Sequence, residues 1–69
     1  MTLVKVMHRY DSGAPHRIEY INPDCITKVV PPYDNHKTYI FGINDNNSIE
    51  VDEQDYKKIM RAANPKIIE

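Results

Sequence analysis

Side chains alternate between two sets in two stretches near the start of the chain. Over residues 2–10 and again over residues 16–21, every second residue belongs to the same set, which is the period of a β-strand. Between them, residues 11–15 include aspartate, glycine and proline, which favour a turn and end regular strand pairing. The pattern predicts a β-hairpin, and Val4 and Val6 are its best candidates for the core.

Three further stretches of β-branched and aromatic residues follow. Residues 26–30 predict a short strand, because the prolines at 31–32 cannot donate the hydrogen bonds that would extend it. Residues 37–43 have the strongest strand pattern in the chain, and residues 48–51 return after an asparagine-rich turn at 44–47. We therefore predict one more strand followed by a second hairpin.

One helix is predicted near the end of the sequence. Asp52 has the side-chain acceptor expected of an N-cap, and Asn64–Pro65 favours termination. Residues 66–69 form a tail whose isoleucines either pack against the sheet or add an edge strand in an oligomer. The apolar residues of the helix have the spacing of a single stripe, which consists of Tyr56, Ile59, Met60 and Ala63.

These elements define a single domain over residues 1–69, because so short a chain offers material for only one small core. The predicted fold class is α+β and mostly β, with about five antiparallel strands in two hairpins and one C-terminal helix packed on the sheet. The narrow helical stripe covers one sheet face only. The other face would keep apolar groups such as Met7, Ile21 and Ile40 without cover, and this favours a homodimer.

Cysteine and histidine usage argues against cross-links, metals and cofactors. Cys25 is the only cysteine, so no disulfide can form within the chain, and a lone thiol is typical of a reducing, cytoplasmic environment. A structural zinc site needs closely spaced ligands, whereas the nitrogen and sulfur candidates are dispersed: His8, His16, Cys25 and His36. We expect neither a bound metal nor a cofactor.

The charge pattern bears on the kind of partner that the chain binds. Nine basic and ten acidic side chains give a net charge of −1, and no basic block is present. Phosphate backbones are bound by clustered positive charge, so nucleic acid is not the favoured partner. No apolar run has the length of a membrane span, and the N-terminal residues lack the pattern of a signal peptide. We expect a cytoplasmic protein that does not bind membranes.

Two groups of residues have the composition of a chemical site. Cys25 and a histidine could form a nucleophile and its base, but no motif and no third orienting residue accompany them, so we expect no catalysis. Residues 45–48, with Glu50 and Asp52, offer oxygen ligands for a cation. They lack the spacing of a calcium loop, and a hairpin turn explains them better.

An Asn-Pro-Asp turn and a set of aliphatic positions lie between residues 20 and 60. The matching residues are Tyr20, Ile21, Asn22, Pro23, Asp24, Ile26, Val29, Asp34, Ile40, Ile49, Val51 and Ile59. In these residues the chain resembles the small FlbD-type proteins associated with bacterial flagellar operons. The resemblance implies a strand, the turn, two more strands and a C-terminal helix, and it supplies no catalytic residue.

The chain departs from this family in two places. It has Asn46-Asn47 where the family tends to have a glycine-containing turn, and its N-terminal hairpin is longer. A fainter resemblance, through the pattern of a strand, a turn and Ile-x-x-Val, connects it with the LytTR-type β-rich DNA-binding domain. The basic contact residues of that domain have no counterpart here.

The favoured function is that of a non-enzymatic protein-binding or regulatory module, which acts by surface contact with a larger protein. A small inhibitor encoded by a phage or a mobile element belongs to this class. Because tyrosine and arginine are enriched at interfaces, the candidate contact residues are Tyr10, Arg17, Tyr20 and Tyr33. The alternative is a nucleic-acid-binding transcriptional regulator that uses the sheet face and basic side chains. In that alternative Tyr39 and Phe41 would stack on bases, although core packing explains both residues better.

Overall fold

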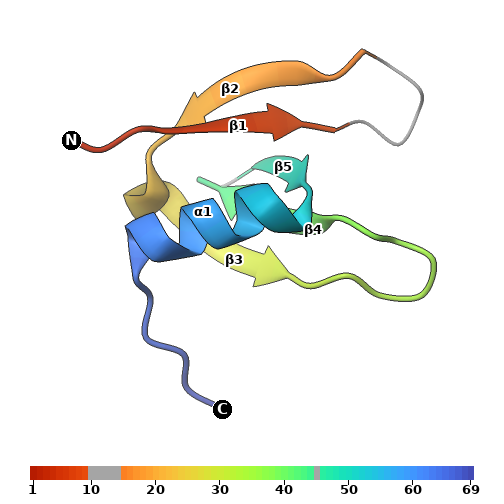
Figure 1. Ribbon diagram of the computed structural model, residues 1–69. Coiled ribbons are helices and arrows are strands. Elements are labelled where there is room, and N and C mark those ends of the chain that lie inside the picture. Colours follow the sequence, from red (N-terminus) through yellow and green to blue (C-terminus); the bar gives the residue numbers. More distant parts are fainter. Residues whose placement is uncertain (10–14, 45) are drawn as a thin grey trace.

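The structure is a computed structural model that describes residues 1–9, 15–44 and 46–69. Within these ranges the chain forms two antiparallel sheets and one α-helix (Figure 1). This arrangement confirms the predicted α+β, mostly β fold class with the helix as the last element. The elements are β1 (Val4–His8), β2 (Arg17–Ile21), the 3₁₀ helix η1 (Pro23–Cys25), β3 (Ile26–Val30), β4 (Tyr39–Ile43), β5 (Asn47–Val51) and α1 (Glu53–Ala63).

The strands are divided between a hairpin and a meander. β1 pairs with β2, and β3, β4 and β5 follow one another in a three-stranded sheet. The strand predicted at residues 26–30 has these bounds in the structure. β4 begins at Tyr39, two residues after the start predicted from the sequence pattern, because Tyr39 is the residue that pairs with Val51 at the end of β5.

A short 3₁₀ helix redirects the chain from the first sheet to the second. Asn22 Oδ1 accepts a hydrogen bond from the backbone N–H of Asp24 at 2.9 Å, and Pro23 presets the backbone at the first turn position. The Cys25 N–H donates to the Asn22 carbonyl at 3.0 Å. The hairpin and the meander form separate sheets (Figure 1); β1 contacts β5, and α1 contacts β1, η1 and β5 and thus connects the two sheets.

The core is drawn from both sheets and from the helix. Phe41 of β4, Val51 of β5 and Ile59 of α1 are fully buried. The predicted core pair of the first strand is confirmed, because both valines are buried. The remaining buried apolar residues are Val4, Val6, Ile21 and Ile49.

The prediction that Ile21 lies on the uncovered sheet face with Met7 is wrong. Ile21 is opposite Val4 in the hairpin register, and opposed residues of antiparallel strands point to the same side. Both residues are buried in the core. The reason is that the hairpin packs its own inner face against the rest of the domain, so the helix is not the sole cover of one flat sheet.

α1 begins and ends at the predicted residues. Asp52 Oδ1 accepts a hydrogen bond from the N–H of Asp55 at 2.9 Å, which makes Asp52 the N-cap. Asn64 has the left-handed backbone that asparagine tolerates, with φ of 47°, and its N–H donates to the Met60 carbonyl at 2.8 Å. Between these caps, Ile59 of the apolar stripe is buried in the core.

The helix also satisfies one edge of β1. The backbone N–H of Met7 donates to Asp55 Oδ2 at 2.9 Å, and Lys58 Nζ donates to the Lys5 carbonyl at 2.7 Å. After the end of the strand, the N–H of Arg9 donates to a carbonyl of β5 at 2.8 Å. Residues 5, 7 and 9 therefore direct backbone groups to this edge, and the other edge of β1 bonds to β2.

Gly42 is buried in β4, opposite a bulge in β3. Ile26 pairs with Ile43 and Lys28 pairs with Gly42, which leaves Thr27 as the additional residue. A Cβ atom at position 42 would lie 2.8 Å from Thr27 Oγ1 and 2.9 Å from Lys28 Cγ. The absence of a side chain at Gly42 therefore permits the close approach of these strands.

Candidate interaction surface on the first hairpin

The face of the β1–β2 hairpin that points away from the core is largely apolar. Ile21 is buried, and side chains alternate along a strand. Ile18 and Tyr20 therefore lie together on the face of β2 opposite to that of Ile21. Ile18 is 50% exposed and Tyr20 is 62% exposed. We refer to the following residues as the outer hairpin face: Lys5, Met7, Ile18 and Tyr20.

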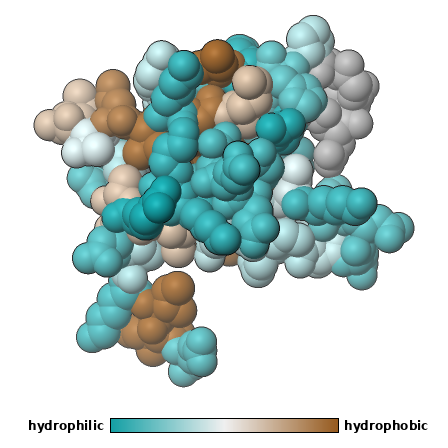
Figure 2. Space-filling model, viewed as in Figure 1, coloured by the Kyte–Doolittle hydropathy of each residue, from teal (hydrophilic) through white to brown (hydrophobic). Residues whose placement is uncertain are grey.

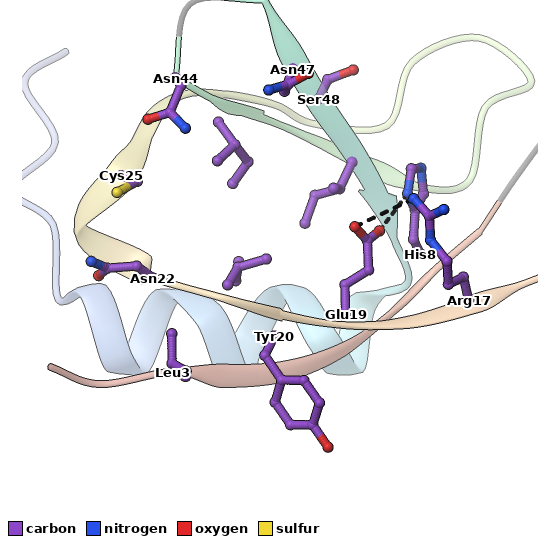
Figure 3. Close-up of a pocket in the computed structure, with 13 residues that line it drawn as sticks. Leu3, His8, Arg17, Glu19, Tyr20, Asn22, Cys25, Asn44, Asn47 and Ser48 are labelled. Carbon is purple, nitrogen blue, oxygen red and sulfur yellow. Dashed lines mark hydrogen bonds and ion pairs between the residues drawn. The ribbon is translucent and has the colours of Figure 1, made fainter.

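The views of the surface agree with this assignment. Figure 2 shows hydrophobic side chains on the side of the molecule where the hairpin lies, whereas the surface over α1 is hydrophilic. Figure 3 shows the ring of Tyr20 directed away from the space between the two sheets. Apolar groups that gather on one face lose contact with water when a partner covers them, which is favourable. The outer hairpin face is therefore a candidate contact surface.

β2 also has an open edge. Since the N–H of Met7 bonds to the helix, the opposed pair Met7 and Ile18 is not hydrogen-bonded within the hairpin. The backbone groups of Ile18, and those of Tyr20 two residues later, consequently point to the far edge of β2. No strand in the part of the chain that the structure describes pairs with this edge. Ile18 and Tyr20 thus combine exposed apolar side chains with backbone groups directed to the edge.

The inner face of the hairpin carries a charged cluster. His8 Nδ1 lies 2.7 Å from Glu19 Oε2, and Arg17 Nη2 lies 3.5 Å from Glu19 Oε1. The two oxygens of Glu19 therefore contact two different side chains. The side chains of His8 and Glu19 are 13% and 26% exposed, whereas that of Arg17 is 64% exposed. Arg17 is the member of this cluster that an incoming partner reaches most easily.

A cavity of about 470 Å³ lies under the hairpin, between its inner face and residues of β4 and β5 (Figure 3). Its lining is apolar at Ile21, Ile43 and Ile49 and includes several amide side chains. Cys25 and His8 both line it, but Figure 3 shows them at opposite ends, with His8 beside Glu19. This geometry does not place the thiol of Cys25 and the ring of His8 together as a nucleophile and its base.

A second hollow, of about 400 Å³, lies between the end of α1 and the β3–β4 part of the meander. The rings of Tyr39 and Tyr56 stack there, with centroids 3.8 Å apart. Phe41 is buried beside them, so both strand aromatics have the core role that the sequence favoured. Ile67 of the tail lines the hollow but is 69% exposed, and Ile68 is 86% exposed, so neither isoleucine is buried against the sheet.

The predicted contact residues do not form one cluster. Arg17 and Tyr20 lie on the same strand but point to its inner and outer face, respectively. Tyr33 lies in the connection between β3 and β4, where its ring is 4.8 Å from that of His36. Tyr10 lies outside the described residues, as does Asp45 of the cation site considered above.

Ile18 was not among the contact residues predicted from the sequence. A signal for Ile18 was available, because it shares a strand face with Tyr20. What the alternation alone did not indicate was which of the two faces of β2 is covered. The register and the burial of Ile21 settle that question.

The chain matches no protein-family model, no curated protein and no solved structure. The resemblance to FlbD-type proteins stays a prediction from the sequence. In residues 1–9, 15–44 and 46–69, no three or more His, Cys, Asp or Glu side chains are grouped so as to hold a metal ion. No helix formed by the described residues combines the length and apolar character needed to span a membrane.

Proposed function

We propose that this chain is a non-enzymatic protein-binding module whose contact surface is the outer hairpin face. The observation that supports the proposal is the exposure of Ile18 and Tyr20, each at least half exposed, on one side of a two-stranded sheet. Apolar residues grouped with a tyrosine are typical of surfaces that bind other proteins. The partner that fits this face is a larger protein with an apolar groove.

The charge of this face favours a protein partner over nucleic acid. Among the described residues of the outer hairpin face, Lys5 is the only basic one, and Arg17 points to the inner face beside Glu19. Binding to a phosphate backbone draws most of its affinity from several clustered cations. The net charge of −1 works against such binding as well. The nucleic-acid-binding alternative has less support for these reasons.

A photo-crosslinking amino acid at position 20 tests the proposal in the host cell. Benzoylphenylalanine resembles tyrosine in shape, and Tyr33 is the matched control position, since it is 50% exposed but lies in a different part of the domain. We expect a covalent adduct with a larger protein from position 20 and none from position 33. Adding Ile18→Asp should abolish the adduct, because a carboxylate on this face would have to lose its water on binding.

Affinity measurements with the purified adduct partner complete the test. Tyr20→Ala should raise the Kd at least about tenfold, as the loss of a central aromatic contact does, and Tyr33→Ala should leave it unchanged. Equal adducts from both positions, or equal effects of both alanine variants, would contradict the proposal. Binding to a labelled oligonucleotide that weakens with salt and depends on Tyr20 would favour the nucleic-acid alternative instead.

A further inference from the structure

The open edge of β2 is complementary to itself. In the sequence of this strand a cation, Arg17, and an anion, Glu19, are two positions apart and flank Ile18. Ile18 and Tyr20 direct backbone N–H and C=O groups to the edge, as the register of the hairpin requires. A sheet edge with such groups accepts an additional strand.

We propose that β2 pairs in antiparallel orientation with β2 of a second copy of this chain, about a two-fold axis that passes through Ile18. This inference goes beyond the proposed function, because it concerns the edge of the hairpin rather than its outer face. In an antiparallel ladder, the residues whose backbone groups point to the shared edge must lie opposite one another. The axis therefore places one residue opposite the same residue of the second copy, and it does not lie midway between two successive residues of the strand. With the axis at Ile18, each Arg17 lies opposite the second copy's Glu19.

Charge selects this register over its neighbours. An axis through Glu19 would place the two Glu19 carboxylates directly opposite each other, which is destabilising. An axis through Tyr20 would place Glu19 opposite the second copy's Ile21 and would leave Arg17 beyond the end of the paired strand. With the axis at Ile18, arginine and glutamate face each other at non-hydrogen-bonded positions, where opposed side chains approach most closely.

The contacts already present around these two residues are compatible with the pairing. The Arg17 side chain is 64% exposed and lies 3.5 Å from Glu19 of its own chain, so its guanidinium can contact a second carboxylate as well. Glu19 keeps His8 at its other oxygen, at 2.7 Å. The assembly is a four-stranded antiparallel sheet, in which the two outer hairpin faces join as one apolar surface. More strands also stabilise a hairpin that is marginal alone.

Complementary charge variants test both the pairing and its register. Arg17→Glu makes positions 17 and 19 both acidic, and Glu19→Lys makes both basic. In a homodimer of either variant, residues of like charge therefore lie opposite each other. We expect sedimentation equilibrium of the parent chain, at up to about 1 mM, to show a weak dimer, as suits a small interface. Each variant alone should raise the dimer Kd about tenfold. An equimolar mixture should form a heterodimer, because the introduced glutamate then faces the introduced lysine.

Three results would overturn the proposal: a parent chain that is monomeric throughout, variants that dimerise as well as the parent, or a mixture that does not recover dimerisation. Glu19→Lys also loses the contact with His8, so a variant with all side chains unchanged is needed in case it unfolds. N-methylation of Ile18 in a chemically synthesised chain removes the edge-directed N–H at the axis and leaves every side chain unchanged. Its circular dichroism should match that of the parent and its dimer should be lost, and a retained dimer would equally overturn the pairing.

These measurements use the purified chain alone. A monomeric result would therefore reject the β2 pairing without affecting the cross-linking test of the proposed function. Conversely, a dimer whose position 20 cross-links to no larger protein would support the pairing and contradict the proposed function.

Discussion

The carboxylate of Asp55 accepts a hydrogen bond from the backbone N–H of Met7 at 2.9 Å, although the two residues are 48 positions apart in the chain. Together with the bond from Lys58 to the Lys5 carbonyl, it provides β1 with partners on the side where a sheet would continue with another strand. Side chains of a helix thus replace a strand at this edge. Because β1 is satisfied on that side, the edge of the hairpin that no strand of the described residues pairs with is on β2.

Asp55→Ala should lower the free energy of unfolding by about 1–3 kcal/mol, because the part-buried N–H of Met7 loses its acceptor. Asp55→Asn keeps an oxygen at this place and loses the ion pair with Lys58 at 3.6 Å, so its effect should be smaller. Urea denaturation followed by circular dichroism gives both values. Glu53→Ala is the control and should cost less than about 0.5 kcal/mol, since Glu53 makes an exposed contact with Lys57. Equal losses in all three variants would refute this role of the hydrogen bond.

Asp52 has two partners, and a pair of variants separates them. Its Oδ1 caps the helix, and its Oδ2 accepts a hydrogen bond from Arg9 Nη2 at 3.0 Å. Asp52→Ala should cost about 1–2 kcal/mol of stability and some helical signal in the far ultraviolet. Asp52→Asn retains the cap, and the difference from the parent should stay below about 1 kcal/mol, because both side chains of the ion pair are 37% exposed. A cost for asparagine as large as that for alanine would assign the effect to Arg9 and not to the cap.

Gly42→Ala should destabilise the meander by about 1–3 kcal/mol, because the added Cβ would meet Thr27 Oγ1 at 2.8 Å and Lys28 Cγ at 2.9 Å. The same substitution in a Thr27→Ala, Lys28→Ala background should cost less, since both of these atoms are then missing. Denaturation of the four chains of this cycle measures the coupling. No reduction of the cost in the altered background would show that the two contacts are not its cause.

Two isoleucines of the C-terminal region should differ in their contribution to stability. Ile59 is fully buried, and Ile59→Ala should cost about 2–5 kcal/mol, enough to unfold a large share of so small a domain. Ile68 is 86% exposed, and Ile68→Ala should change stability by less than about 0.5 kcal/mol. Thermal denaturation distinguishes the two results. Comparable losses would contradict the exposure of Ile68 and would mean that the tail packs against the domain.

Features of the fold that depend on residues close together in the sequence were predictable from it. The caps Asp52 and Asn64 each bond to a residue within one turn of the helix, and their residue types alone indicate that role. The bounds of β3 follow from the Asn-Pro-Asp turn before it and the two prolines after it. The alternation also placed Ile18 and Tyr20 together on one side of their strand.

The choice of the buried face required contacts between distant parts of the chain. Alternation in β2 is equally compatible with Ile21 inside or outside, and only its register with Val4 and the packing of the hairpin decide. For the same reason, the residues predicted from the sequence included Tyr20, which is 62% exposed, but not Ile18 on the same face. No local pattern indicates that a helical carboxylate will bond to the backbone of the first strand.

The span between Lys58 and the Lys5 carbonyl, 53 positions, has a consequence for synthesis on the ribosome. β1 leaves the exit tunnel before the helix residues that provide its last hydrogen-bond partners are translated. Until then both sides of the nascent hairpin are open to other chains and to chaperones, because non-local contacts cannot form before both partners exist. β1 therefore completes its hydrogen bonding only after α1 has been made.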